Sequence, residues 1–205
     1  NEEALRRNVS PMNASRFECC TALKTRALQE VIGERGFDAI IVSIRRDEHG
    51  IRSKERYMSP RDKDFKWKVY RDKSGGDSGL EALQDTELSG WGLFESDFGP
   101  ETDHVRVHPI LHWTELDVWQ YVKDRNLPYN PLYRADYVEK AYGVSGRRYR
   151  SLGCRPCTIP ILSKASTIDE IIEEIRLSNE EERSGRAQDK ESMYIMEQLR
   201  ALGYM

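Results

Sequence analysis

The sequence predicts an α/β protein, in which helices flank a sheet and a loop-rich C-terminal region adds further helices. The first observation is a helical pattern over residues 15–35 that leads directly into an unbroken apolar run over residues 37–44, as a buried parallel strand would have. The second is a short alternating strand over residues 105–110, followed at once by another helix. We therefore expect the sheet domain to occupy residues 1–125 and the C-terminal region to occupy residues 126–205.

The helices are predicted from their end signals as well as from their apolar faces. Ser15 is a suitable N-cap for the first helix, and Gly36 is a suitable residue just beyond its C-terminus. Thr114 is an N-cap followed by acidic residues, and its helix continues to about Lys123. The remaining segments are an irregular stretch at 71–103, a loop-rich stretch at 126–150, and amphipathic helices at 167–177 and 189–202.

Composition and charge narrow the class of protein. The chain has 205 residues and a formal net charge of −3, with acidic and basic residues mixed along its length. This mixture gives no basis for a general nucleic-acid or membrane surface, and no apolar run approaches the length of a membrane span. Since there is no secretory signal either, we expect a cytoplasmic protein. Because the chain opens at Asn1, without an initiator Met and within what reads as a helix, we expect further sequence upstream.

A charged segment follows the first predicted strand and is the principal candidate for a binding site. Ligands of open α/β sheets sit at the carboxyl ends of the strands, and guanidinium groups bind phosphate and sulfate oxygens in bidentate fashion. A charge run is also typical of a solvated loop with internal ion pairs, and charge alone does not separate the two interpretations. We predict Arg45, Arg46 and Arg52 as anion ligands, Asp47 as the residue that orients them by ion pairing, and Arg56 and Arg61 as further nucleotide-binding candidates.

The four cysteines form two close pairs, Cys19-Cys20 and Cys154-x-x-Cys157. Without a secretory signal, such pairs are more typical of metal or redox sites than of disulfides. Neighbouring side chains on a helix diverge, so Cys19 and Cys20 suit two corners of an iron–sulfur cubane better than one zinc ion, and the second pair would supply the other two thiolates. A [4Fe–4S] cluster is the first interpretation, and a zinc site, a redox-active pair or buried inert thiols remain open.

Several short motifs occur in the order in which they occur in a known family. They are Arg45 to Glu48, Arg52 to Arg56, Ser59 to Asp62, His108 to Glu115, Val118 to Tyr121, Pro131 to Tyr133, Arg150 to Cys154, Ile171 to Glu174, Glu182 to Arg186 and Gly203-Tyr204. Together they resemble the family of small catalytic subunits of bacterial ATP sulfurylase (sulfate adenylyltransferase subunit 2). That family is part of the larger phosphoadenylyl-sulfate reductase and PP-loop ATP pyrophosphatase family, and the resemblance covers nearly the whole chain.

The resemblance implies a fold, an activity and partners. The fold is a Rossmann-like PP-loop sheet, similar to the adenine nucleotide alpha hydrolases, and the activity is transfer of AMP from ATP to sulfate. Mg²⁺ accompanies ATP, and the assembly contains a GTPase partner subunit or is a homo-oligomer. Lys24-Thr25 with the following Leu28 also resembles a stretch of that family, so the resemblance makes Lys24, Arg183 and Arg186 candidates for substrate or nucleotide binding.

The same family carries a Ser-Gly-Gly-x-Asp-Ser loop, after its first strand, that cradles the phosphates of ATP. The segment from Lys73 to Ser78 follows no apolar strand and precedes no clear helix, so we do not assign it that role. We therefore expect the phosphate loop and the N-terminal part of the sheet upstream of Asn1, and the enzymatic assignment depends on that loop.

The cysteines leave other functions open. Their motifs, Glu18-Cys19-Cys20 and Gly153 to Thr158, resemble the cluster motif of iron–sulfur adenylyl-sulfate reductases, and sulfurylase subunits do not carry all four cysteines. Reduction of adenylyl sulfate or phosphoadenylyl sulfate needs a nucleophilic thiol, and no cysteine follows Cys157, which argues against a reductase. Iron–sulfur ATP pyrophosphatases of DNA sulfur modification also resemble this family, and only that alternative implies a nucleic-acid partner. Without a phosphate loop, the chain would be a non-catalytic fragment that binds a partner.

Overall fold

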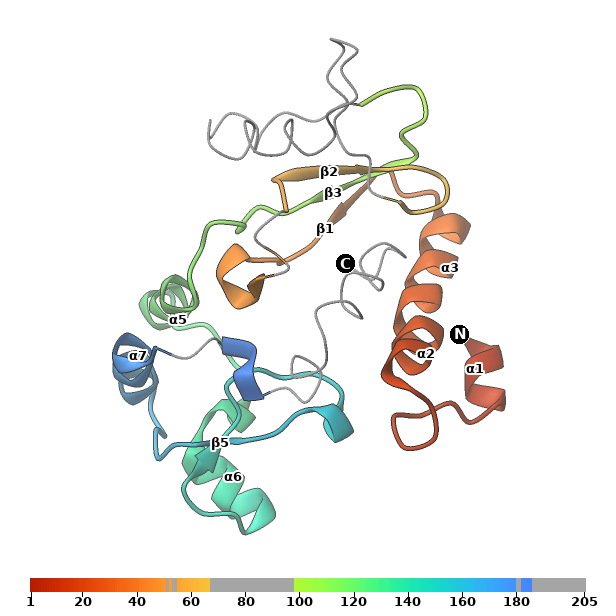
Figure 1. Cartoon of the computed structure of the whole chain (residues 1–205). Helices are drawn as coiled ribbons and strands as arrows, with labels where there is room; N and C mark the ends of the chain where they lie inside the picture. Colours follow the sequence, from red (N-terminus) through yellow and green to blue (C-terminus); the bar gives the residue numbers. More distant parts are fainter. Residues whose placement is uncertain (51, 53–54, 67–97, 180–181, 186–205) are drawn as a thin grey trace. The chain divides into compact units, whose positions relative to one another are not determined.

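A computed structural model of the chain describes residues 1–50, 52, 55–66, 98–179 and 182–185 (Figure 1). By their internal packing these residues form two compact units. The first contains the described residues within 1–44 and 54–111, and the second contains those within 45–53 and 112–193. The boundary predicted after residue 125 falls inside the second unit, and as a division into domains it stays a prediction.

Both units contain helices and strands. The first contains α1 (Glu2–Arg6), α2 (Arg16–Cys20), the π-helical turn η1 (Thr21–Thr25), α3 (Arg26–Arg35), β1 (Ala39–Ile41), β2 (Met58–Arg61) and β3 (His104–Val107). The second contains the 3-10 turn η2 (Arg46–Glu48), α5 (Glu115–Asp124), η5 (Pro131–Tyr133), α6 (Ala135–Tyr142), β4 (Arg147–Arg148), η6 (Arg155–Cys157), β5 (Ile161–Leu162), α7 (Ile168–Leu177) and η7 (Glu182–Gly185). The predicted α/β class is confirmed.

The predicted helix over residues 15–35 is confirmed as α2, η1 and α3, with one irregular turn. Ser15 accepts a hydrogen bond from the backbone of Glu18 in a capping box, and Gly36 ends α3 in the left-handed conformation, at φ 62°. The turn η1 follows the cysteine pair directly, and π-turns of this kind are frequent at functional sites. The helix α1 begins directly after Asn1, whose side chain accepts a hydrogen bond from the backbone N–H of Ala4.

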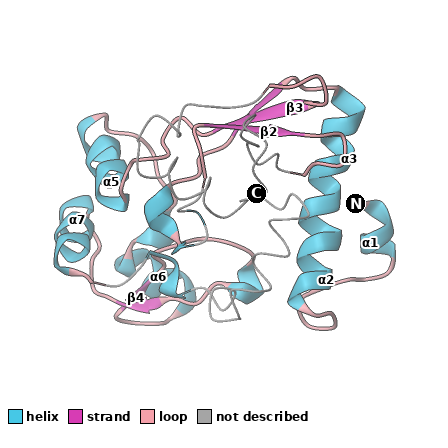
Figure 2. Ribbon diagram, turned by 45° about the horizontal axis from the view of Figure 1, so that its top comes forward, coloured by secondary structure: helices cyan, strands magenta, loops and turns pink. Residues whose placement is uncertain are grey.

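The sheet of the first unit has three strands in the order β1-β3-β2. β1 and β3 are parallel, whereas β2 and β3, which lie side by side in Figure 2, are antiparallel. The predicted parallel pairing of the first strand is confirmed, but its predicted length and burial are wrong, because β1 has three residues and Ile41 is 76% exposed. Among the described strands β1 pairs only with β3, so it lacks the second neighbour that a central strand would have.

One face of the β2–β3 pair is buried although its residues are polar. Arg106 lies opposite Ser59, and His104 lies opposite Arg61, so the four side chains share one face of the sheet. None of these residues is more than 1% exposed. Burial lowers the pKa of Arg106, and the nearby carboxylate of Glu55 opposes that shift. The candidate Arg61 is therefore part of the interior of the first unit.

The helix α6 lies within residues 126–150, so the prediction that this stretch is loop-rich is wrong for eight residues. Ala135 and Val138 are buried three positions apart, and Gly143 ends the helix with φ 69°. The breakers that favoured a loop flank this helix without interrupting it; they are Pro128, Pro131, Gly143 and Gly146.

The core of the second unit joins α5 and α7. Trp119 of α5 packs with Ile171 and Ile172 of α7, and Tyr129 and Tyr133 each contact the Trp119 ring edge-on at 5.3 Å between ring centroids. The predicted cap at Thr114 is present on α5, and Thr167 caps α7, since each helix begins with a complete capping box. This packing fixes the N-terminus of α5, where the functional network described below begins.

The described residues contain no helix that is long and apolar enough to cross a membrane. The predicted helix at 189–202, the segment from Lys73 to Ser78, and most of the irregular stretch at 71–103 lie outside the described residues. The described end of that stretch, residues 98–103, has no helix or strand, as predicted.

Candidate functional site

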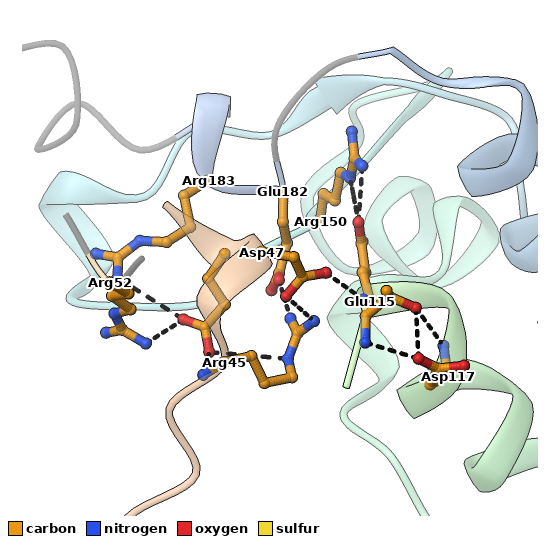
Figure 3. A network of polar contacts seen from close by, with 10 residues as sticks. Arg45, Asp47, Arg52, Glu115, Asp117, Arg150, Glu182 and Arg183 are labelled. Atoms are coloured by element: carbon orange, nitrogen blue, oxygen red, sulfur yellow. Dashed lines mark hydrogen bonds and ion pairs between the residues drawn. The ribbon is translucent and has the colours of Figure 1, made fainter. Parts of the chain in front are cut away.

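The arginine segment is the centre of a polar network in the second unit (Figure 3). Arg45 is only 5% exposed, and its guanidinium donates from Nη1 to Asp47 Oδ1 at 2.7 Å and from Nη2 to Glu182. Its Nε lies 3.8 Å from Oε1 of Glu48, which also accepts a hydrogen bond from the backbone N–H of Arg45 at 3.2 Å. The expected ion pair between Asp47 and an arginine of the segment is present, and carboxylates surround the Arg45 guanidinium.

A second part of the network gathers around the other oxygen of Glu48. Arg52 donates to Glu48 Oε2, and Nη1 of Arg183 lies 3.9 Å from the same oxygen. Arg183 is 2% exposed, so it is a buried member of the network and does not lie on a solvent-exposed turn.

Asp47 connects the segment to α5. Its Oδ2 accepts a hydrogen bond at 2.6 Å from the backbone N–H of Glu115, the first residue of that helix, where the helix dipole favours a negative charge. The Glu115 carboxylate in turn accepts from Nη2 of Arg150 at 2.7 Å, and both of its oxygens accept from Nε at 3.1 Å. Their side chains are 9% and 7% exposed, so this pair is almost fully removed from water.

The network is balanced in formal charge when all its members are ionised. It contains four guanidinium groups, from Arg45, Arg52, Arg150 and Arg183, and four carboxylates, from Asp47, Glu48, Glu115 and Glu182. Buried ion pairs of this kind add little net stability compared with apolar packing, but removing one partner strongly lowers the free energy of unfolding. The network therefore fixes the orientation of its arginines before any ligand binds.

Glu182 is the member of the network with the most perturbed titration. Burial raises the pKa of Glu182 to about 7; Arg45 opposes the rise, and the acidic groups of Glu115, Glu48 and Asp47 add to it. Its side chain is 17% exposed. A carboxylate that both contacts a buried arginine and titrates near neutral pH is typical of a functional site.

A small cavity of about 130 Å³ adjoins the network. Its lining combines charged side chains of the network with apolar and aromatic side chains of α5 and the segment that follows it. Pockets for drug-sized ligands measure roughly 300–1,000 Å³, so this cavity suits a few water molecules or a small ion and not a nucleotide. Its lining residues are Arg45, Glu115, Arg150, Glu182, Val118, Trp119, Val122, Tyr129 and Tyr133.

The other predicted binding residues lie outside this network. Lys24 is in η1, Arg61 ends β2, and Arg56 is half-buried just before that strand, all in the first unit. The carbonyl oxygen of Arg56 lies 2.6 Å from Nδ1 of His108, whose pKa burial lowers. Arg46 is half-buried within η2 of the second unit, and Arg186 lies outside the described residues.

Sequence reasoning missed four members of the network: Glu48, Glu115, Arg150 and Glu182. Glu115 was predicted only as an acidic residue of a first helical turn, and the other three occurred only inside motifs. Arg150 pairs with a residue 35 positions away, and Glu182 pairs with one 137 positions away. Local patterns in one sequence contain no signal for such distant pairings, although they show that Arg150 and Glu182 lie near other charged residues.

Each unit contains one of the two cysteine pairs, and none of these four described cysteines forms a disulfide bond. Cys19 and Cys20 end α2 and are buried, while Cys154 and Cys157 bracket the turn η6, in which the Cys157 N–H donates to the Cys154 carbonyl at 2.9 Å. Thr158 Oγ1 donates to the same carbonyl at 2.9 Å and further fixes the turn. The described residues contain no group of three or more His, Cys, Asp or Glu side chains placed to hold a metal ion.

Comparison with known proteins identifies the family. Residues 1–160 match the family model of the phosphoadenosine phosphosulfate reductase domain, and the chain therefore belongs to that family. The chain is 33% identical to the sulfate adenylyltransferase subunit 2 of Pseudoalteromonas translucida, with 100% of this chain and 70% of the relative covered. It is 32% identical to the protein of the same name from Saccharophagus degradans and 33% identical to that from Sulfurovum sp., with 100% of this chain and 69% of each relative covered. These matches confirm the resemblance found in the sequence motifs and the Rossmann-like α/β fold that it implies.

Proposed function

We propose that the complete protein is a sulfate adenylyltransferase, which transfers AMP from ATP to sulfate and releases pyrophosphate. The observation that carries this proposal is the similarity of the whole chain to sulfate adenylyltransferase subunit 2 proteins, at 32–33% identity. The buried arginine network of the second unit supports it, because adenylyl transfer between two anions needs cations that are already in place.

Adenylyl transfer requires the protein to position two anions and to stabilise the charge of the transferred group. A sulfate oxygen attacks the α-phosphorus of ATP, the bond from that phosphorus to the oxygen that bridges to the β-phosphorus breaks, and pyrophosphate leaves with the electron pair. The products are adenylyl sulfate and pyrophosphate, and no thiol, oxidant or reductant takes part. Fixed guanidinium groups hold the two anions together and stabilise the charge that spreads over the transferred group.

The structure supports a division of roles within the arginine segment. Carboxylates surround Arg45, so it holds the segment in place, with Asp47 as its local partner. Arg46 and Arg52 are the proposed ligands of the anionic groups. The substrate-binding candidates outside the segment are Lys24, Arg56, Arg61, Arg183 and Arg186.

Mg²⁺ would enter the reaction bound to ATP. The described residues contain no group of three or more acidic, histidine or cysteine side chains placed to hold a metal ion, and each carboxylate of the network already pairs with an arginine.

Pyrophosphate release tests the proposed function. The complete protein, together with any subunit that co-purifies, is expected to produce pyrophosphate and adenylyl sulfate from ATP·Mg²⁺ only when sulfate is present. Equal release with and without sulfate would instead favour an ATP pyrophosphatase of DNA sulfur modification, for which the four cysteines are the favouring observation. No release under either condition would refute both activities.

We also propose that the two cysteine pairs together hold one [4Fe–4S] cluster. None of these four described cysteines forms a disulfide bond, and neighbouring side chains on a helix diverge, as separate cluster corners require. The turn η6 holds the second pair at a short fixed separation. When bound, the cluster would cross-link distant parts of the chain, and no step of adenylyl transfer needs it.

Metal analysis of the protein tests the cluster. After anaerobic purification we expect about four iron and about four sulfide per chain, and less than half of that iron in each of the variants Cys19→Ser and Cys154→Ser. Ser163→Ala, which removes a hydroxyl of the second unit that binds Glu174, is the control and should retain the iron. Colourless protein with about one zinc and no sulfide would contradict the cluster.

The subunit designation of the relatives supports a partner for this chain. We propose that the partner is a GTPase subunit, with a homo-oligomer as the alternative assembly, and that the protein acts in the cytoplasm. Co-purification followed by measurement of the mass of the complex distinguishes the two assemblies.

A further inference from the structure

We propose that Glu182 is a positioning residue for the arginine segment. Its ionised carboxylate holds the Arg45 guanidinium, and with it residues 45–52, in the geometry that binds the acceptor oxyanion. The inference rests on the proposed adenylyl transfer and adds to it a residue from the opposite end of the described chain.

The geometry separates two kinds of contact to Arg45. Asp47 and Glu48 belong to the same short segment as Arg45, so their ion pairs shape the segment but move together with it. Glu182 comes from η7, 137 residues further along the chain. Its contact with Nη2 of Arg45 therefore fixes where the segment lies within the second unit.

Asp47 also contacts a residue outside the segment, because its Oδ2 accepts a hydrogen bond from the backbone N–H of Glu115. The segment is thus tied to the rest of the second unit by the ion pair of Arg45 with Glu182, by the hydrogen bond of Asp47 to the Glu115 backbone, and by Arg183 Nη1, which lies 3.9 Å from Glu48 Oε2. The tie at Arg45 depends on Glu182, whose carboxyl group changes charge near neutral pH.

The groups that face Glu182 explain its raised pKa. η2 contributes Arg45 together with the acidic groups of Asp47 and Glu48, and α5 contributes Glu115, which Arg150 partly neutralises. Tyr129 and Tyr133 line the same cavity. Burial and the three acidic neighbours outweigh the single direct cation, and the pKa of Glu182 rises to about 7.

The raised pKa of Glu182 determines how the free energy of unfolding changes with pH. The pKa of Glu182 is raised from an ordinary value of 4.5, so between about pH 4.5 and about pH 7 the folded protein keeps a proton that the unfolded chain has lost. Stability from this group is therefore fully present below that window and falls as pH rises through it. Ionised Glu182 weakens the fold while it holds Arg45, a conflict that is typical of residues kept for function.

The pH dependence of adenylyl transfer tests the proposal. In the wild-type protein, kcat/KM for sulfate should rise between about pH 6 and about pH 8 with an apparent pKa near 7. In Glu182→Gln, kcat/KM at about pH 8 should fall roughly tenfold to a hundredfold, the range expected from losing one hydrogen bond to a charged group, and the rise with pH should disappear. Glu182→Asp, which keeps the charge, should retain part of the rise.

The matched control is Glu174→Gln. Glu174 also pairs with a buried arginine of the second unit, but its partner is Arg148, which is outside the Arg45 network. This variant should leave the pH profile unchanged. If Glu182→Gln keeps the wild-type profile, or if Glu174→Gln loses it, the proposal is wrong.

Amide hydrogen exchange tests the same proposal without activity. Protection factors for residues 45–48 should be lower at about pH 6 than at about pH 8 in the wild type, and low at both values in Glu182→Gln. If the wild type transfers no adenylyl group at any pH but shows this protection pattern, the proposed function fails and the positioning role of Glu182 stands. Protection that depends on neither pH nor Glu182 overturns the positioning role, whatever the activity.

Discussion

Replacement of Arg45 by Lys is expected to lower kcat/KM for adenylyl transfer by at least about a hundredfold, the effect of misplacing binding groups by roughly 1 Å. Arg45 uses separate nitrogens for Asp47 and Glu182, and its Nε faces Glu48. A lysine has one compact ammonium group, which cannot reach three carboxylates that surround a planar fork. The substitution keeps the charge but loses the geometry, so activity should fall although the charge balance of the network is unchanged.

The measurement compares kcat/KM and the free energy of unfolding for Arg45→Lys and Arg45→Met. Arg45→Met should also lose about 3–5 kcal/mol of stability, because it leaves buried carboxylates without their cation. Arg134→Lys is the control, since Arg134 pairs with Asp136 at the surface, where both side chains are at least 40% exposed. Full activity in Arg45→Lys would show that the network needs only a positive charge at this position.

Replacement of Arg150 by Ala is expected to lower the free energy of unfolding by about 3–5 kcal/mol at neutral pH. Arg150 makes three hydrogen bonds to the Glu115 carboxylate and a fourth, at 3.1 Å, to Ser178. Without the guanidinium, a carboxylate that is 9% exposed stays buried next to other acidic groups. The cost of desolvating that charge, more than the lost attraction itself, determines the size of the effect.

A double-mutant cycle measured by urea unfolding separates the two contributions. Arg150→Ala combined with Glu115→Gln should recover part of the lost stability, because the buried negative charge is removed together with its partner. Arg134→Ala should change stability by less than about 1 kcal/mol, as expected for an exposed pair. Strict additivity of the Arg150 and Glu115 substitutions would show that the two side chains do not interact in solution.

The features that the sequence predicted correctly are those with local causes. The caps at Ser15 and Thr114 and the left-handed Gly36 depend on residues within a few positions, so the corresponding helix ends were placed well. The parallel pairing of the first strand was predicted from its composition and confirmed. The helix α6 was missed because the surrounding prolines and glycines outweighed a short apolar pattern.

The candidate site was predicted in part. The motif around Arg45 and Asp47 was identified, and Arg183 was a candidate that the structure places in the same network. The partners that give the network its properties, Glu115, Arg150 and Glu182, were not identified, because their roles depend on tertiary contacts. A titration near neutral pH is likewise a property of burial and of neighbouring charges, which no local pattern encodes.

The π-helical turn η1 has a consequence for the cysteine pair that precedes it. An α-helix turns by about 100° per residue, so the additional residue of a π-turn rotates everything before it relative to everything after it. The side chains at the end of α2, Cys19 and Cys20, are therefore rotated about the helix axis relative to the buried face of α3, which contains Ile32. The residue inserted in the π-turn sets this rotation, so the direction of the two thiols does not follow from the way in which α3 packs.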